Sequence, residues 1–385
     1  MIKREITPEL IQMSKEYPIV TILGPRQAGK TTLAQMTFPD KPYLNMESPE
    51  IRLLAEEDPN GFLAQYPNGA IIDEVQRTPE LFSYLQVIVD KKKKNGLFIL
   101  TGSHQFDLHT KITQSLAGRT AILYLLPLTF SEVAQQETIS DENIFMQKGF
   151  LPRIYDEKQQ PLKAYRHYLQ TYVERDIRQL INIKDLSAFQ KFMVACAGRV
   201  GQLINYDSMA SEIGVSNNTI KEWFSILEAS FIVVRLQPYF ANINKRLIKT
   251  PKLFFVETGL AAYLLGIESL THMQRDPLRG HLFENMIVME LIKTRYNKGL
   301  DPHLYFYRDQ QQHEIDVIYK NGHQLIPIEI KSSKTFNKDF LKELDYFSKL
   351  FPEQCEQGYV IYAGEQHQKI GWRSLLNYLD VSQII

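Results

Sequence analysis

The sequence has few cysteines, no long apolar run and no excess of either charge. Its 385 residues include only Cys196 and Cys355, too few and too far apart for a disulfide framework or a zinc cluster. No apolar run reaches the roughly 18 to 20 residues that cross a bilayer, and the charged start of the chain lacks the apolar core of a signal peptide. We therefore expect a cytoplasmic chain with no membrane contact. Lys and Arg together number 44, as do Asp and Glu, so any nucleic-acid surface must be local.

The composition is that of a folded protein with more than one domain. Hydrophobic residues make up 44% of the chain and charged residues 23%, which excludes a disordered or collagen-like chain. A chain of 385 residues exceeds the size at which one hydrophobic core keeps growing. From the patterns described below we expect three domains, over residues 1–135, 136–265 and 266–385, and an α/β fold class.

A strand, a glycine-containing loop and a helix follow one another near the start of the chain. Residues 17–23 form a β-branched apolar run, and residues 33–36 favour a helix. The loop between them matches G-x-x-x-x-G-K-[ST], whose backbone N–H groups and following helix N-terminus bind phosphate oxygens. We expect Lys30 to reach the β- and γ-phosphates of ATP and Thr31 to hold Mg²⁺, whereas a merely glycine-rich turn is the alternative. The predicted nucleotide-binding residues of this segment are Gly24, Pro25, Arg26, Gln27, Ala28, Gly29, Lys30, Thr31 and Thr32.

A second apolar strand, at residues 70–72, ends in Asp73 and Glu74. This is the form of a Walker B strand, in which Asp73 lies on the magnesium side and Glu74 orients the attacking water. An ordinary acidic turn is the alternative. Residues 96–103 form a further strand with a polar tip, where Thr101 or Ser103 would sense the γ-phosphate. Short apolar strands between helical stretches predict a parallel sheet with nucleotide at the carboxyl ends of its strands.

The chain resembles AAA+-type ATPases that carry a C-terminal domain of unknown function, the AAA_14/DUF4143 family, over nearly its whole length. The resemblance is carried by residues 24–31, 72–76, 100–103, 115–119, 126–130 and 171–178. It implies an oligomer, because an arginine just before the fifth strand of such ATPases often completes a neighbouring subunit's site. Arg119 stands at that position as the candidate arginine finger, with a surface role as the alternative. Two positions depart from the family pattern, with Phe150 where a second glycine is common and Glu257 where aspartate is usual.

The middle of the chain, over residues 160–230, has a helical pattern that includes a helix-turn-helix signature. Residues 206–224 show a capped short helix, a turn at Gly214 and a second helix opened by Ser216. A strand at 231–236 and a basic segment at 245–255 complete a winged helix. We expect DNA contact through residues 207–252 and through the C-terminal domain, and the alternative for the winged helix is a lid or oligomerisation role. The residues predicted to face DNA are Asn217, Asn218, Lys221 and Glu222 on the second helix, and Lys245, Arg246, Lys249 and Lys252 on the wing.

Three strands are predicted beyond residue 300, at 304–309, 314–319 and 325–333. Asp316 and the segment Glu329-Ile330-Lys331, with Glu284 on a preceding helix, resemble the PD-(D/E)xK nuclease core. Strand alternation places Glu329 and Lys331 on one side of their strand, facing Asp316. We expect Glu284, Asp316 and Glu329 to hold a second Mg²⁺ or Mn²⁺ with Lys331 beside it. An exposed charged sheet face is the alternative.

Together these patterns predict a P-loop parallel-sheet ATPase domain, a helical and winged-helix middle domain and a C-terminal α/β nuclease-like domain. The predicted function is an ATP-binding and ATP-hydrolysing homo-oligomer that uses Mg²⁺ and acts on DNA, with Lys30, Glu74 and Arg119 as catalytic residues. Two alternatives stay open. One is an ATP-dependent regulatory or antitoxin-like switch, and the other is a DNA-cleaving defence effector.

Overall fold

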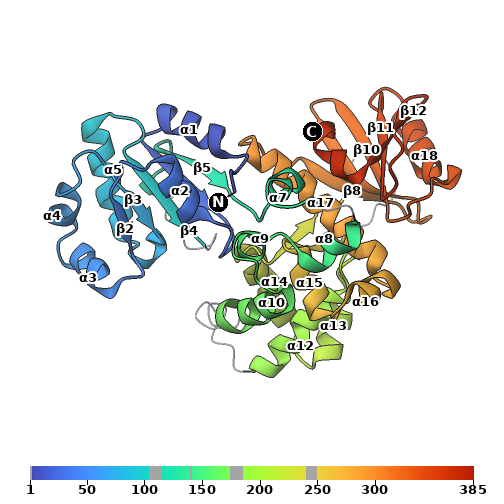
Figure 1. The fold of residues 1–385 in the computed structure, drawn as a ribbon, viewed down its shortest axis with the longest axis horizontal. Coiled ribbons are helices and arrows are strands. Elements are labelled where there is room, and N and C mark those ends of the chain that lie inside the picture. Colours follow the sequence, from blue (N-terminus) through green and yellow to red (C-terminus); the bar gives the residue numbers. More distant parts are fainter. Residues whose placement is uncertain (1, 104–114, 139–140, 174–184, 240–248) are drawn as a thin grey trace. The chain divides into compact units, whose positions relative to one another are not determined.

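The computed structural model describes the chain except for residues 1, 104–114, 139–140, 174–184 and 240–248 (Figure 1). The chain divides into two compact units. Unit 1 comprises Met1–Leu128, Ala229–Phe231 and Tyr296–Leu300, and unit 2 comprises Thr129–Glu228, Ile232–Arg295 and Asp301–Ile385. Across the described ranges, no helix combines the length and the apolar character needed to cross a membrane.

In unit 1, short strands alternate with helices, which is the pattern that builds a parallel sheet. The elements are, in chain order, α1 (Thr7–Glu16), β1 (Ile19–Leu23), α2 (Lys30–Thr37), β2 (Tyr43–Asn45), α3 (Pro49–Glu57), α4 (Pro59–Ala64), β3 (Ile71–Asp73), η1 (Val75–Arg77), α5 (Leu81–Lys92), β4 (Phe98–Gly102) and β5 (Thr120–Tyr124).

The five strands of unit 1 form one sheet in the order β2-β3-β4-β1-β5, and every neighbouring pair is parallel. All five residues of β1 are buried, as expected of an inner strand covered on both faces. Leu10 of α1 and Leu33 of α2 share an apolar core with Val20 and Ile99. Because the strands are parallel, the carboxyl ends of β1, β3 and β4 lie along one edge of the sheet.

The described residues between 129 and 276 are mainly helical. Asn205 caps α13 by accepting from the N–H of Ser208 at 2.9 Å, and Gly214 ends that helix in the left-handed conformation. Phe192 packs against Trp223 and Phe224, which joins α12 to α14. The elements are α7 (Phe130–Ala134), α8 (Glu142–Lys148), α9 (Pro152–Asp156), α10 (Pro161–Tyr168), η2 (Leu169–Val173), α12 (Leu186–Ala197), α13 (Tyr206–Ile213), α14 (Asn217–Ala229), β6 (Val233–Leu236), β7 (Lys252–Phe255), α15 (Thr258–Leu264) and α16 (Leu270–Arg275).

The C-terminal part of unit 2 is built on a mixed sheet in the order β12-β13-β11-β10-β9-β8. Strand β9 pairs antiparallel with both β8 and β10, whereas β10 and β11 are parallel. The elements are α17 (Arg279–Asn297), β8 (Leu304–Arg308), β9 (Glu314–Asn321), β10 (Gln324–Lys331), η3 (Lys338–Leu341), α18 (Lys342–Leu350), β11 (Gly358–Tyr362), β12 (Gln368–Ile370), β13 (Arg373–Asn377) and η4 (Tyr378–Ile384).

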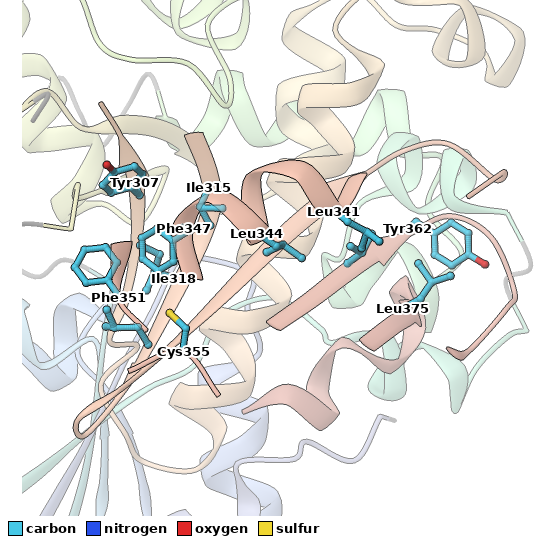
Figure 2. Packing of buried hydrophobic residues seen from close by; sticks show 12 residues of the cluster. Tyr307, Ile315, Ile318, Leu341, Leu344, Phe347, Phe351, Cys355, Tyr362 and Leu375 are labelled. Atoms are coloured by element: carbon cyan, nitrogen blue, oxygen red, sulfur yellow. The ribbon is translucent and has the colours of Figure 1, made fainter. Parts of the chain in front are cut away.

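Helix α18 packs onto this sheet through a core of aliphatic and aromatic side chains (Figure 2). Leu344 and Phe347 of α18 are fully buried, and Phe347 contacts the ring of Tyr307 at a centroid distance of 5.2 Å. Cys355 is a free, buried thiol in the same core. This packing fixes β9 and β10, the strands that carry the acidic residues discussed below.

The predicted fold class is confirmed at a coarse level. The structure has a five-stranded parallel sheet in the N-terminal part, a helical middle and a mixed sheet in the C-terminal part. The division into three domains stays a prediction, as do the winged-helix and nuclease-like assignments.

Candidate functional site

The P-loop runs from β1 to α2 and is shaped by two glycines. Gly29 has a φ of +89°, in the left-handed region that favours glycine, and directly precedes α2. A Cβ atom on Gly24 would lie 2.0 Å from the carbonyl oxygen of Leu125, so a side chain does not fit there. Arg4 donates to the carbonyl oxygens of Ala28 and Leu126 at 2.5 and 2.6 Å, which ties the loop to the segment after β5. The backbone thus curves tightly before the N-terminus of α2.

Lys30 is the first residue of α2, and its side chain folds back into the loop. It is 5% exposed, and its Nζ donates to the carbonyl oxygens of Gly24 and Pro25 at 2.9 and 2.8 Å. Burial lowers the pKa of Lys30, and the nearby carboxylates of Glu74 and Asp73 offset only part of this effect. The ammonium is therefore a buried cation whose hydrogen bonds go to neutral carbonyl oxygens.

Asp73 ends β3, and three hydroxyl groups hold its carboxylate. Thr31 donates to Oδ1 at 2.9 Å, and Tyr43 donates to Oδ2 at 2.7 Å. Thr101 of β4 also donates to Oδ1. A threonine hydroxyl beside a carboxylate offers the hard oxygen ligands that Mg²⁺ prefers. Thr31 and Asp73 therefore fit the ion that accompanies ATP.

Glu74 follows Asp73 in the left-handed conformation, with a φ of +53°, and its side chain is held on the same edge of the sheet. Its Oε2 accepts from Ser103 Oγ at 2.9 Å and from Gln76 Nε2. Burial alone would raise the pKa of Glu74, but Lys30 and the hydrogen bonds from Gln76 and Ser103 lower it. Glu74 is thus an ionised, oriented carboxylate at neutral pH.

The remaining predicted loop residues lie around this centre. Arg26 pairs with Glu47 at 3.4 Å, and Ala28 is buried. Gln27 has a φ of +62°, and Thr32 is exposed on α2. The structure thus brings Lys30, Thr31, Asp73, Glu74 and Ser103 to one edge of the sheet, although their roles stay predictions.

Arg119, the predicted arginine finger, forms an ion pair within its own unit. Its Nε and Nη2 donate to Asp90 Oδ1 and Oδ2 at 2.7 and 2.8 Å. This bidentate geometry is the strong form of an arginine–carboxylate contact, although both side chains are partly exposed. A finger role would require Arg119 to leave Asp90, so that role stays a prediction.

Two residues of this site were assigned no role by sequence reasoning. Tyr43 reaches Asp73 because β2 and β3 are neighbours, a pairing that the sequence does not state. Gln76 lies two residues after Glu74 and contacts both Glu74 and Ser103. The sequence signal that could have indicated a role for Gln76 was its position in residues 72–76, one of the segments that carry the family resemblance.

A second charged cluster lies in unit 2, where the predicted residues of the C-terminal strands meet. Lys331 Nζ lies 2.6 Å from Glu329 Oε2 and 3.6 Å from Asp316 Oδ2. Glu284 of α17 instead contacts Lys252, at 2.9 Å from Oε1. Burial and the neighbouring Asp316 raise the pKa of Glu329, although Lys331 counteracts them.

A second metal site at Glu284, Asp316 and Glu329 is not supported. Among the described residues, no three Asp, Glu, His or Cys side chains are arranged to hold a metal ion. The physical reason is that ammonium groups already neutralise these carboxylates, Lys331 between Asp316 and Glu329 and Lys252 beside Glu284.

The predicted DNA-facing residues of the middle region differ in their exposure, and Lys249, just before β7, is exposed. Asn218, Lys221 and Glu222 are exposed on α14, whereas Asn217 donates to Asp207. Lys245 and Arg246 lie outside the described residues. The expectation that Lys252 contacts phosphate is wrong, because its side chain is 2% exposed and paired with carboxylates.

Three family models match successive parts of the chain. An AAA domain model matches residues 16–134, and two models of domains of unknown function follow, DUF8612 at 140–271 and DUF4143 at 279–380. Uncharacterized proteins of Mycobacterium tuberculosis and Mycobacterium bovis are each 30% identical over 336 residues, covering 86% of this chain and 74% of theirs. An uncharacterized protein of Haemophilus influenzae is 24% identical over 373 residues, covering 86% of each chain.

Solved structures give more distant likenesses. The Walker-type ATPase of Pyrococcus abyssi is 14% identical with a TM-score of 0.48, over 69% of this chain and 96% of that one. DnaA from Aquifex aeolicus bound to AMPPCP is 14% identical with a TM-score of 0.32, over 58% of this chain and 86% of that one. Likenesses this distant do not bear on function. The family models and the mycobacterial relatives show the family instead. The chain belongs to the AAA_14/DUF4143 family, in which an AAA-type ATPase domain precedes a C-terminal domain of unknown function.

Proposed function

We propose that this chain binds and hydrolyses ATP and uses the hydrolysis to act on DNA. The observation that carries the first half is the convergence of Lys30, Thr31, Asp73, Glu74 and Ser103 at the carboxyl ends of three parallel strands. Ligands bind at this edge of parallel α/β sheets. The AAA domain model over residues 16–134 covers all of these residues.

The proposed chemistry assigns each residue a separate task. Lys30 binds the β- and γ-phosphates, and the N–H groups of the loop before α2 surround them. Thr31 and Asp73 hold Mg²⁺, which neutralises developing charge on the phosphate oxygens when it is bound. Glu74 orients the attacking water, since its lowered pKa keeps it ionised at neutral pH and suits it to hydrogen bonding. Ser103 holds Glu74 in place.

We also propose that the chain forms a homo-oligomer. Arg119 would act on a neighbouring subunit's nucleotide only after its bidentate contact with Asp90 opens. Replacing Asp90 by Ala should therefore leave ATP hydrolysis intact or faster, whereas Arg119→Ala should slow it. Equal rates in the two variants would remove Arg119 from the catalytic residues.

The proposal of DNA contact rests on α13 and α14, a helix-turn-helix pair that is followed by the antiparallel strands β6 and β7. Asn218 and Lys221 are exposed on α14, and Lys249 is exposed just before β7. Neutralising Lys221 and Lys249 should flatten the log–log salt dependence of DNA binding by about 0.9 for each phosphate group that is no longer bound. Lys91→Ala, which removes an exposed charge from α5, is the control. An unchanged slope would assign the pair a structural role.

The nuclease-like assignment of the C-terminal domain also remains a proposal about fold. The meeting of Asp316, Glu329 and Lys331 on neighbouring strands supports the likeness to a PD-(D/E)xK core. DNA cleavage is not part of the proposed function, because among the described residues no three Asp, Glu, His or Cys side chains are arranged to hold a metal ion.

A second candidate function is an ATP-dependent switch with slow turnover. It is favoured by the engagement of Lys30 with its own loop and of Glu74 with Gln76 and Ser103, since both contacts must rearrange before hydrolysis. One assay separates the two functions. ATP hydrolysis is measured without DNA and with single-stranded, duplex and branched DNA, with Glu74→Gln as the inactive reference. DNA stimulation supports the first function, slow DNA-independent turnover supports the switch, and a rate equal to that of Glu74→Gln removes both.

A further inference from the structure

Arg26 adds a second positive charge to the P-loop, at the turn of the loop. The N–H of Ala28 donates to the carbonyl oxygen of Pro25 at 3.4 Å, so Arg26 and Gln27 are the two residues of the turn between them. The Arg26 side chain is 25% exposed, and its Nη1 lies 3.4 Å from Glu47 Oε1. The direction of this side chain is therefore known from its contact with Glu47.

The order of the strands places that contact over the edge of the sheet where the proposed nucleotide site lies. Arg26 follows β1, and Glu47 follows β2. In the order β2-β3-β4-β1-β5, the strands β3 and β4 lie between these two. Glu74 follows β3, and Ser103 follows β4. The side chain of Arg26 therefore extends across the carboxyl ends of β4 and β3, next to the carboxylate of Glu74.

The electrostatics of two neighbouring groups agree with this position. Burial lowers the pKa of Lys30, and the positive charge of Arg26 lowers it further. Burial would raise the pKa of Glu74, but Lys30 and, to a smaller extent, Arg26 are among the groups that lower it. A charge shifts a pKa in this way only from nearby. Arg26 is thus close both to the ammonium and to the carboxylate of the proposed site.

The ion pair that holds Arg26 is easier to open than the one that holds Arg119. Arg26 has one printed contact with Glu47, at 3.4 Å, whereas Arg119 makes two contacts with Asp90, at 2.7 and 2.8 Å. Bidentate pairs are the stronger kind. Arg77 Nη2 also lies 3.9 Å from Glu47 Oε1, so Glu47 keeps a cation nearby when Arg26 turns away.

We propose that Arg26 is a catalytic arginine that acts in cis, leaving Glu47 to bind the γ-phosphate oxygens of the ATP held by its own chain. This inference rests on the proposed ATP hydrolysis. The planar guanidinium offers a fork of N–H donors that fits phosphate oxygens, and it stabilises the charge on the transferred phosphoryl group.

Arg26 forms no covalent bond in this reaction. The oxygen of water bonds to the γ-phosphorus, the β–γ bridging oxygen leaves with the bonding electrons as part of ADP, and one proton of the water is released. Arg26 keeps its proton throughout and only neutralises charge. Its contribution therefore needs no neighbouring subunit, unlike that of Arg119.

The first test compares equilibrium binding of Mg²⁺-AMPPNP, a non-hydrolysable ATP analogue, with that of Mg²⁺-ADP to the full chain. Arg26→Ala should weaken AMPPNP binding at least about tenfold and ADP binding less than about threefold, because only AMPPNP carries a γ-phosphate. Retained ADP binding also shows that the variant is folded. Equal losses for the two nucleotides would overturn the proposal.

The second test measures single-turnover hydrolysis. Arg26→Ala should be at least about a hundredfold slower than the wild type, and Arg26→Lys should recover AMPPNP binding but only part of the rate, because the charge remains and the fork is lost. The matched control is Arg77→Ala, since Arg77 approaches the same oxygen of Glu47 and is 31% exposed. It should bind and hydrolyse like the wild type. A loss equal to that of Arg26→Ala would overturn the proposal.

A mixing experiment tests the action in cis. Arg26→Ala and Glu74→Gln are combined, so that each chain lacks one of the two groups. No activity should return, because no single site has both. Recovery of hydrolysis in the mixture would show that Arg26 acts on a neighbouring chain and would overturn the proposal. A wild type that binds AMPPNP but hydrolyses no ATP refutes the proposed function instead, and the AMPPNP–ADP comparison then still tests the contact of Arg26 with the γ-phosphate.

Discussion

The two charged sites of this chain use buried lysines in opposite ways. Lys30 in unit 1 donates to two carbonyl oxygens, and burial lowers its pKa. Burial acts on Lys252 and Lys331 in unit 2 as well, but the carboxylates in contact with them outweigh it and raise the pKa of both. The difference lies in the partners and not in the depth of burial, since Lys30 and Lys252 are 5% and 2% exposed.

This difference separates an open site from a closed one. A buried ammonium that contacts only neutral oxygens retains an unmet attraction for anions, which suits Lys30 to phosphate. An ammonium between two carboxylates has that attraction satisfied within the chain. The proposed nucleotide site therefore contains a cation without a carboxylate in contact, whereas the acidic cluster of unit 2 already contains its counter-ions.

The largest expected effect is on nucleotide binding. Lys30→Ala should abolish tight ATP binding, because the cation placed at the β- and γ-phosphates is lost. Glu74→Gln should bind ATP as the wild type does and hydrolyse it at least about a hundredfold more slowly, since water is no longer oriented by a carboxylate. Equilibrium binding of a fluorescent ATP analogue and single-turnover hydrolysis distinguish the two. Near-normal hydrolysis by both would remove the Walker assignments.

The second effect concerns stability and separates the two kinds of lysine directly. Lys252→Met should lower the free energy of unfolding by about 3–5 kcal/mol, because Glu284 and Glu314 lose a buried partner. Lys30→Met, the same substitution at the other buried lysine, should leave the free energy of unfolding unchanged or raise it when no nucleotide is present. Urea unfolding at neutral pH measures both. Similar losses in the two variants would contradict the comparison.

A third prediction uses a buried carboxyl group in unit 2 that relies on backbone donors. Glu257 is 4% exposed and accepts from the N–H groups of Phe150 and Gly259 at 2.9 and 3.1 Å. Burial raises the pKa of Glu257 from 4.5 to about 7, although these hydrogen bonds and Lys293 counteract it. Because folding raises the pKa of Glu257, the contribution of this carboxyl group to the free energy of unfolding is complete below pH 4.5. That contribution is lost as the pH rises through about 7.

The free energy of unfolding should fall by an amount on the order of 3 kcal/mol over this pH range, because each pKa unit corresponds to about 1.4 kcal/mol. Glu257→Gln keeps an oxygen acceptor and removes the titration, so its stability should fall less than that of the wild type between pH 4.5 and 7. Chemical unfolding across this range gives the comparison. Parallel curves for wild type and variant would show that Glu257 titrates normally.

The smallest predicted effect concerns Gln76, which donates to Glu74 and Ser103. Gln76→Ala should lower kcat about tenfold, from the loss of roughly 1.4 kcal/mol of transition-state stabilisation, and leave KM for ATP nearly unchanged. Since Gln76 helps to lower the pKa of Glu74, the acid limb of the pH–rate profile should move to higher pH. A rise in KM with an unmoved acid limb would assign Gln76 to nucleotide binding instead.

Contiguous motifs were predictable because their geometry is local. The segment from Gly24 to Thr31 had to curve before a helix, and its strand–loop–helix form is confirmed. The strands around Asp316 and Glu329 were also placed within a few residues, because their alternation is visible in the sequence. The assignment of Lys252 to a phosphate-binding wing was wrong, although a basic run beside paired strands is usually exposed, because Lys252 is buried.

Tertiary structure decided which residues that lie far apart in the sequence contact each other. Tyr43 meets Asp73 only because β2 pairs with β3, and Lys252 meets Glu284 only because Asn285 holds β7 against α17. Such contacts join residues about 30 positions apart, and no periodicity or spacing encodes them. The sequence by itself determined which charged groups this protein has and where its phosphate loop lies. Tertiary structure decided which of those charges stay available to a ligand, because burial and the choice of partner set the state of each group.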